Sequence, residues 1–214
     1  MIALAFGRAM PSLRISEKQG SPFISHRAGR LPSDGNTMVF RLFRRSANRD
    51  LIDRLRGEIV AAARDPVLFT EYGIEDSLEG RFEVLALHAA LVLRHLNRMK
   101  PPAPEMAQDL TDSLFRSFDG ALREMGIGDT GVPKRMRTIA EAFLGRAGAY
   151  DRALNGGTPG LAAALARNVY DGRGNPDRLA RYVEAANQAL ANASLEAFTS
   201  GPVPFPRPSA IPRA

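Results

Sequence analysis

The sequence of 214 residues contains no cysteine, and this absence excludes three kinds of chemistry. Disulfide bonds, thiol nucleophiles and metal sites with thiolate ligands all require cysteine. The motifs of common catalytic sites are also missing. No glycine-rich segment continues into the Lys-Ser or Lys-Thr pair of a phosphate-binding loop, and no serine lies in a nucleophile elbow. We therefore expect no catalytic residues and a protein that is not an enzyme.

Histidine is scarce, which limits metal and haem sites. His88 and His95 are seven residues apart, roughly 10 Å along a helix, so they cannot bind one metal ion together. No Glu-x-x-His motif accompanies the acids of residues 109–124, as a helical di-metal site requires. We expect no metal and no cofactor. Both histidines are predicted to be buried or at the edge of the core, with pH sensing or transient haem contact as the alternative.

The net charge of +6 is concentrated at the N-terminal end of the chain. Residues 1–60 carry 11 basic and 5 acidic groups, whereas residues 61–214 carry 18 of each. A polyanion or an anionic membrane surface is therefore a natural partner for the N-terminal region. The alternative is that the arginines only improve solubility.

Residues 1–37 are predicted to be a disordered leader, because they contain proline, glycine and serine, few acids and no apolar period. No stretch there is long enough for a secretory signal or a transmembrane helix. Three prolines interrupt the amphipathic helix that an organelle transit peptide would need. An ordered pattern begins at Met38. We expect Met38 to be the natural start and the leader to be an overcalled or dispensable extension.

Residues 38–199 are predicted to form a single compact all-α domain of several helices. Residues 77–96 are too apolar for a surface helix and too interrupted by charge for a membrane helix, so they form a central helix packed on more than one side. Apolar residues recur at helical spacing over residues 48–65, 106–125, 132–154, 159–169 and 177–198. No strand pattern competes. Residues 200–214 form a Pro-rich tail that is predicted to be disordered.

Residues 38–49 interleave arginines with large apolar side chains, which is typical of segments that lie on RNA or on anionic lipid. A ribosome-associated module and a peripheral membrane protein are therefore alternative functions, and packing of the aromatic side chains on the core is the structural alternative. The residues predicted to make ribosome or membrane contact are Phe40, Arg41, Phe43, Arg44, Arg45 and Arg49.

Two sequence blocks are similar to the ubiquinol-cytochrome c chaperone family. The first is GIEDSLEGRFE at residues 73–83, followed by Leu87-His88. The second is LREMGIGD at residues 122–129, followed by VPKRMR at 132–137, FLGR at 143–146 and Ala149-Tyr150. The resemblance covers residues 38–190 and is closest to the bacterial branch.

This resemblance implies a non-enzymatic factor that binds newly made cytochrome b and assists assembly of the bc1 complex. Mitochondrial relatives work with a small partner protein and at the ribosome, so both are possible partners, and no DNA partner is expected. The implied location is the cytoplasm, with peripheral contact at the inner face of the membrane, or the mitochondrial matrix in a eukaryote.

A chaperone of apolar client segments is expected to present an apolar groove flanked by charge. Met99, Met106, Met125 and Met136 could adapt to such clients or could simply fill the core. The residues predicted to bind the client or a partner are Glu79, Arg81, Phe82, Glu83, His88, Lys134, Arg135, Met136, Arg146 and Tyr150.

Overall fold

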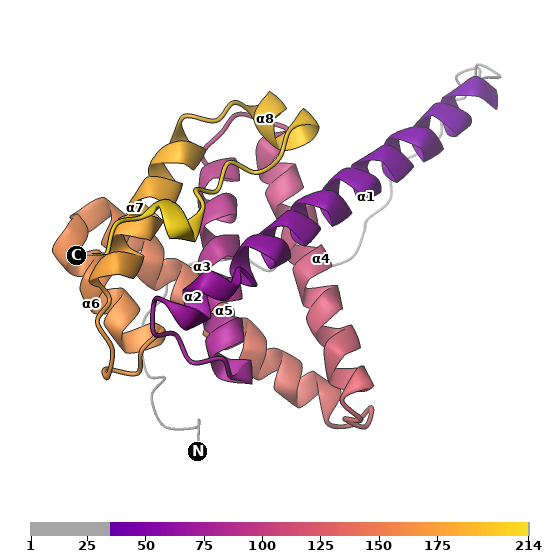
Figure 1. The fold of residues 1–214 in the computed structure, drawn as a ribbon. Coiled ribbons are helices and arrows are strands. Elements are labelled where there is room, and N and C mark those ends of the chain that lie inside the picture. Colours follow the sequence, from indigo (N-terminus) through magenta and orange to yellow (C-terminus); the bar gives the residue numbers. More distant parts are fainter. Residues whose placement is uncertain (1–34, 214) are drawn as a thin grey trace, which may run out of the picture.

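The structure, a computed structural model, describes residues 35–213, with the backbone alone for residues 35–47 and Thr158. All regular secondary structure in this part of the chain is helical, which confirms the predicted all-α class (Figure 1). The helices are α1 (Gly35–Ala63), α2 (Pro66–Thr70), α3 (Leu78–Leu96), α4 (Ala103–Glu124), α5 (Val132–Gly156), α6 (Thr158–Asn168), α7 (Asp177–Ala191), α8 (Leu195–Ser200) and the 3-10 turn η1 (Pro208–Ala210).

Helix α3 is the central element, as its composition predicts. Thirteen of its 19 residues are buried, and α1, α4, α5 and α7 all pack against it. The helix begins at the predicted cap, where the Ser77 hydroxyl accepts a hydrogen bond of 3.1 Å from the backbone N–H of Gly80. A helix that is apolar on several sides needs neighbours on several sides, and the other helices supply them.

Helix α1 begins at Gly35, well before the predicted start near residue 48. Its C-terminal half buries Ile52, Leu55 and Ile59 against α3 and α4. Its first part, residues 35–47, extends away from the body as a single helix, and we call this part the α1 arm (Figure 1). The side chains of Phe40 and of the other predicted contact residues before Asn48 lie outside the described residues, as does the predicted leader up to residue 34.

The predicted last helix over residues 177–198 is interrupted. Helix α7 ends at Ala191 and the separate helix α8 starts at Leu195. The predicted start signal does operate, because the Asn175 side-chain oxygen accepts a hydrogen bond of 2.9 Å from the backbone N–H of Asp177.

The prediction of a disordered tail over residues 200–214 is wrong for the described residues. Residues 201–213, here called the C-terminal strap, run back over the body from α8 (Figure 1). Val203 and Pro208 are buried. Phe205 packs its ring against His88, with the centroids 5.0 Å apart. Proline prevents this segment from becoming a long helix, but it does not prevent the segment from packing.

Side chains of the body bind the backbone of the strap in place of a regular hydrogen-bond ladder. Near the start of the strap, Arg54 Nη1 donates to the carbonyl of Gly201 at 2.6 Å, and the Glu58 carboxylate accepts from the backbone N–H of Val203 at 2.6 Å. Further along, the Tyr72 hydroxyl donates to the carbonyl of Pro208 at 2.7 Å. These bonds satisfy backbone groups that the prolines leave without partners in the segment itself.

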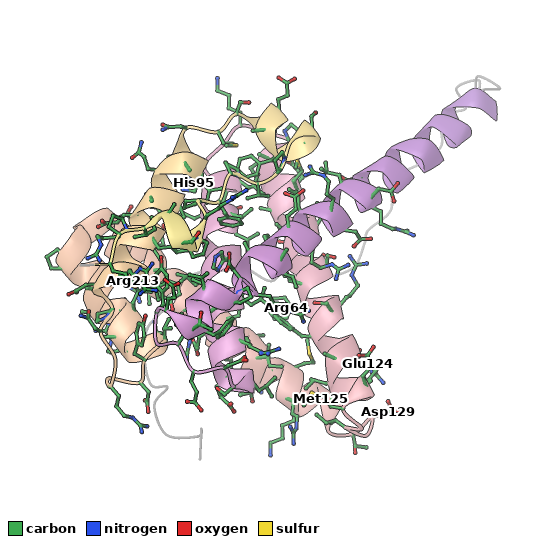
Figure 2. The ribbon with its side chains drawn as sticks, in the orientation of Figure 1. Arg64, His95, Glu124, Met125, Asp129 and Arg213 are labelled. Carbon is green, nitrogen blue, oxygen red and sulfur yellow. The ribbon has the colours of Figure 1, made fainter. Side chains whose placement is uncertain are left out.

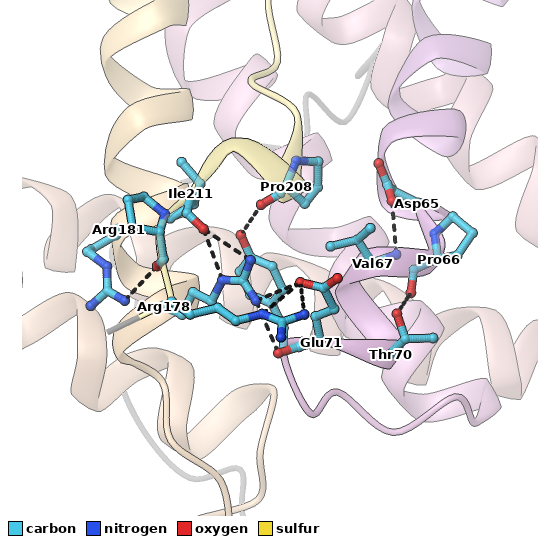
Figure 3. A network of polar contacts seen from close by, with 12 residues as sticks. Asp65, Pro66, Val67, Thr70, Glu71, Arg178, Arg181, Pro208 and Ile211 are labelled. Atoms are coloured by element: carbon cyan, nitrogen blue, oxygen red, sulfur yellow. Dashed lines mark hydrogen bonds and ion pairs between the residues drawn. The ribbon is translucent and has the colours of Figure 1, made fainter.

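Arg178 joins the strap to α7 and to the residue that follows α2 (Figure 3). Its Nε and Nη2 donate to the carbonyl of Ile211 at 3.2 and 3.0 Å, and its Nη1 donates to the Glu71 carboxylate at 3.0 Å. The guanidinium lies 4.3 Å from the centre of the Tyr72 ring. Arg213 also contacts Glu71, and the two arginines together lower the pKa of that carboxyl. The strap is therefore part of the folded body.

Candidate functional site

The two sequence blocks meet where α3 crosses α5. Glu83, in the first block, accepts two hydrogen bonds of 3.0 Å from Arg146 Nε and one of 2.6 Å from Arg146 Nη2. The side chain of Glu83 is only 10% exposed and that of Arg146 is 20% exposed. Burial raises the pKa of Glu83 although Arg146 opposes this effect, and the carboxylate raises the pKa of Arg146. The pair fixes α3 against α5 and is largely covered by the surrounding helices.

Tyr150 lies one helical turn beyond Arg146 and is fully buried. Burial is the main cause that raises the pKa of its phenol, and the neighbouring Glu83 carboxylate adds to the effect. Glu83, Arg146 and Tyr150 were all predicted to bind a client or partner. The structure brings them together, but inside the helix junction.

His88 is also inside the body, with no exposed surface. Its Nδ1 donates to the carbonyl of Val84 at 2.8 Å, because that oxygen can only accept, and its Nε2 then accepts from the Tyr182 hydroxyl at 2.7 Å. Burial lowers the pKa of His88 to about 4, so the ring is neutral at pH 7. His95 makes a separate contact with α7, through Asn187. Both histidines are buried, as predicted.

Phe82 begins a chain of aromatic rings between α3, α4 and α5. Its ring lies 6.1 Å from that of Phe118, Phe118 lies 5.9 Å from Phe115, and Phe115 lies 5.6 Å from Phe143. Phe143 is buried, whereas the other three are only partly buried. Phe82 is therefore both a packing residue and part of the surface.

Several other residues of the first block lie at the start of α3, where their contacts show which are exposed and which serve the fold. Arg81 forms an exposed ion pair of 2.6 Å with Asp76, just before the helix, and Glu79 is exposed in the first turn. Gly80 is buried beside the preceding loop. A Cβ atom built on it would lie only 2.0 Å from the carbonyl oxygen of Glu75, so glycine is required there for steric reasons. Glu79 and Arg81 are available to a partner, whereas Gly80 serves the fold.

The start of α5 is basic and has no side-chain cap. Lys134 and Arg135 are exposed and form no ion pair within the described residues, while Arg137 pairs with Glu141. Met136 is partly buried. Positive charge is unfavourable at a helix N-terminus. Lys134 and Arg135 are therefore accessible to a partner, and their positive charges do not stabilise the start of the helix.

Incompletely covered apolar side chains are found on the three helices that carry the two blocks. Leu78 is 64% exposed, Met125 57% and Leu144 49%, and the three helices pack against one another in pairs. Met125 lies where α4 ends, near Glu124 and Asp129 (Figure 2). Of the other predicted adaptable methionines, Met106 is buried and Met99 packs on the core. We call the following set the three-helix surface: Leu78, Phe82, Phe118, Met125, Met136 and Leu144.

A groove of about 880 Å³ lies between α1 and α4. A groove flanked by charge was expected, but its position on these two helices was not predicted. Ile52 and Phe115 are the large apolar residues of its lining, and Asn48 lies at the end towards the α1 arm. Asp109, Asp112 and Asp119 of α4 are three and seven residues apart, a spacing that puts them on one face of the helix. The charged residues that line the groove are Arg49, Asp53, Asp109, Asp112, Arg116 and Asp119.

Within residues 35–213, no group of three or more potential ligands is placed to hold a metal ion. None of the helices in the same range is sufficiently long and apolar to cross a membrane.

The profile described as "Ubiquinol-cytochrome C chaperone" matches residues 70–205, which include both sequence blocks. The chain belongs to this family. A solved structure, the crystal structure of the Cbp3 homolog from Brucella abortus, is 37% identical, with a TM-score of 0.72. The match covers 82% of this chain and 100% of that one. A comparison with curated proteins finds no match.

The family match covers most of the structural features described above, including the crossing of α3 and α5. The matched region extends into the C-terminal strap, so at least part of the strap belongs to the region shared by the family. It also contains α3, α4 and α5, which carry the three-helix surface. The α1 arm lies outside the matched region.

Proposed function

We propose that this protein is a non-enzymatic assembly chaperone that binds newly made cytochrome b and assists biogenesis of the bc1 complex. The observation that carries the proposal is the match to the chaperone family over residues 70–205. The family is described as a ubiquinol-cytochrome c chaperone, which points to the bc1 complex, and cytochrome b as the client is our inference. The similar crystal structure of a Cbp3 homolog supports the same role.

The three-helix surface is the part of the body that suits an apolar client. Exposed Leu78, Met125 and Leu144 are large apolar side chains that folding has left uncovered. Apolar helices bind to such surfaces through anchors at successive turns, and methionine adapts to clients of varied shape. Exposed Arg81 and Lys134 lie in the two sequence blocks and supply polar groups near these anchors in the chain. We propose these residues as client contacts.

Several members of the predicted site lie in contacts between helices of the body. Glu83, Arg146, Tyr150 and His88 hold α3 against α5 and α7, so their substitution would impair client binding only through the fold. Removing one member of a buried ion pair costs roughly 3 to 5 kcal/mol of stability.

We place the chaperone in the cytoplasm with peripheral contact at the inner face of the membrane, because a membrane-protein client must be held where it inserts. In a eukaryote the corresponding place is the mitochondrial matrix. Binding to a small partner protein is also a prediction. Contact of the basic segment over residues 38–49 with the ribosome is another.

Deletion of the gene in its native host tests the function. We expect the membranes to lose spectroscopic haem b and bc1 activity together, and a plasmid copy to restore both. Unchanged haem b and bc1 activity in the deletion strain would contradict the proposal.

Site variants then test the three-helix surface. The triple variant L78Q/M125Q/L144Q should lower assembled bc1 complex at least about tenfold, because removal of each good apolar anchor typically costs more than 1 kcal/mol of binding. The matched control, R167Q/A191Q/E196Q, makes three changes to glutamine at exposed positions on α6, α7 and α8. Both variants should keep the wild-type circular dichroism spectrum. Normal assembly by the folded L78Q/M125Q/L144Q variant would remove this surface from the proposal.

A further inference from the structure

The groove between α1 and α4 combines apolar residues with four carboxylates, two of which have no ion-pair partner among the described residues. Phe115, which is partly buried, supplies its large apolar surface, and Ile52 lies almost fully covered at its floor. Asp109 accepts a hydrogen bond of 2.7 Å from Asn48, and Asp112 accepts one of 3.0 Å from Gln108. Neither carboxylate has an ion-pair partner among the described residues.

The remaining charges of the groove do not reverse this balance. Asp53 and Asp119 are paired with Arg56 and Arg123, which do not line the groove. Among the described residues of the lining, Arg49 and Arg116 are basic, so four carboxylates there face two guanidinium groups. The groove therefore fits a helix that is both basic and apolar.

The chain itself contains a helix of this composition. Residues 38–47 of the α1 arm include three arginines and four large apolar residues, and no acid. The arm extends beyond the body (Figure 1). It is continuous with the part of α1 that forms one wall of the groove, so a straight arm cannot enter the groove of its own chain.

We propose that the groove receives the α1 arm of a second copy of this chain, so that the protein forms a two-fold symmetric dimer. Asn48, which lines the groove, immediately follows the arm. Two α1 helices that cross in antiparallel orientation near this point therefore bring each arm to the other chain's groove. One contact then occurs twice, as in a closed isologous dimer. This inference does not depend on the identity of the client.

Sedimentation equilibrium of the full chain tests the proposal. At low salt, where interactions between charges are least screened, the wild-type protein should sediment with twice the mass of one chain. The groove variant D109R/D112R and the arm variant R44E/R45E should each sediment as monomers. Their equimolar mixture should recover dimers, because each intact arm meets an intact groove and the reversed charges also match.

A control variant distinguishes the effect of charge changes inside the groove from the effect of charge changes elsewhere on α4. E105R/E124R makes the same change of charge at two exposed positions of α4 that do not line the groove, and it should remain dimeric. Circular dichroism should show the same helix content in every variant. The proposal is overturned if the wild-type chain is monomeric at all concentrations, as it would be if the arm served only a membrane or the ribosome. Dissociation of E105R/E124R, or a mixture that stays monomeric, would also overturn it.

Discussion

The α1 arm and the C-terminal strap are the two ends of the described chain, and each has what the other lacks. The arm is regular helix that extends away from the body, whereas the strap has almost no regular structure and is bonded to the body along its length. Regular secondary structure satisfies backbone groups locally. Firm attachment to the body requires buried side chains and partners from other elements, which the strap has at Arg54, Tyr72 and Arg178.

Removing each end separately would test this comparison most severely. Deletion of residues 201–214 should lower the free energy of unfolding by on the order of 5 kcal/mol, because it uncovers apolar surface and leaves several buried donors without acceptors. In dilute solution, where the dimer dissociates, deletion of residues 1–47 should change it by less than about 1 kcal/mol. Urea denaturation measures both values. Similar losses for the two deletions would refute the contrast.

The pH dependence of stability tests how well the strap is packed, because Phe205 of the strap lies against the buried His88. The pKa of His88 is about 4 in the folded protein, below the ordinary value of 6.5. Between these values the unfolded chain binds a proton that the folded chain does not. His88 should therefore cost the fold up to about 1.4 kcal/mol per pH unit as the pH falls from 6.5 to 4, roughly 3 kcal/mol in all.

Urea denaturation over this pH range measures the effect, and His88→Gln is the control because glutamine does not titrate. The variant should be less stable at pH 8 but should lose less stability on acidification. Equal pH dependence in both proteins would show that His88 is not kept neutral by burial.

Substitution of one arginine near each end compares how much the two ends contribute to stability. Arg178→Ala removes the bonds to Ile211 and Glu71 and the contact with the Tyr72 ring, and it should cost about 2 kcal/mol. Arg49→Ala, at the base of the arm, should cost less than about 0.5 kcal/mol because Arg49 is exposed. Thermal denaturation of both variants in dilute solution provides the measurement. The comparison would fail if Arg49→Ala were the more destabilising change.

The smallest expected effect concerns one hydroxyl group. Tyr72→Phe keeps the ring beneath Arg178 but removes the bond to the Pro208 carbonyl. The loss should be about 1 kcal/mol, the typical net value of one hydrogen bond. Urea denaturation is accurate enough to detect it. An unchanged midpoint would mean that water replaces the phenol at this carbonyl without cost.

The sequence predicted the parts of the fold that depend on local pattern. The Ser77 cap, the central position of α3 and the burial of His88 follow from cap chemistry, apolar spacing and the scarcity of further metal ligands. The strap did not follow, because its order depends on Arg54 and Arg178, which are 147 and 33 residues from the carbonyls that they bind. The conformational limits of proline apply to its own segment. They do not identify hydrogen-bond donors that lie far away in the sequence.

The candidate site shows the same limit. The two sequence blocks drew attention to Glu83 and Arg146 as client or partner contacts, and only the crossing of α3 and α5 shows that they bind each other. Residue type could not separate these buried residues from exposed Arg81 and Lys134, because arginine and glutamate occur in both groups. The position of the groove was not predicted because its walls come from α1 and α4, whose contact is not encoded in any short segment.

Gly80 has a consequence for how such a sequence can change over generations. Any side chain at this position would collide with the carbonyl of Glu75, so selection for folding alone would keep it glycine. Glu79 and Arg81 on either side are exposed and meet no such restriction. In descendants that acquire a different client, these neighbours are free to diverge while the glycine between them stays fixed.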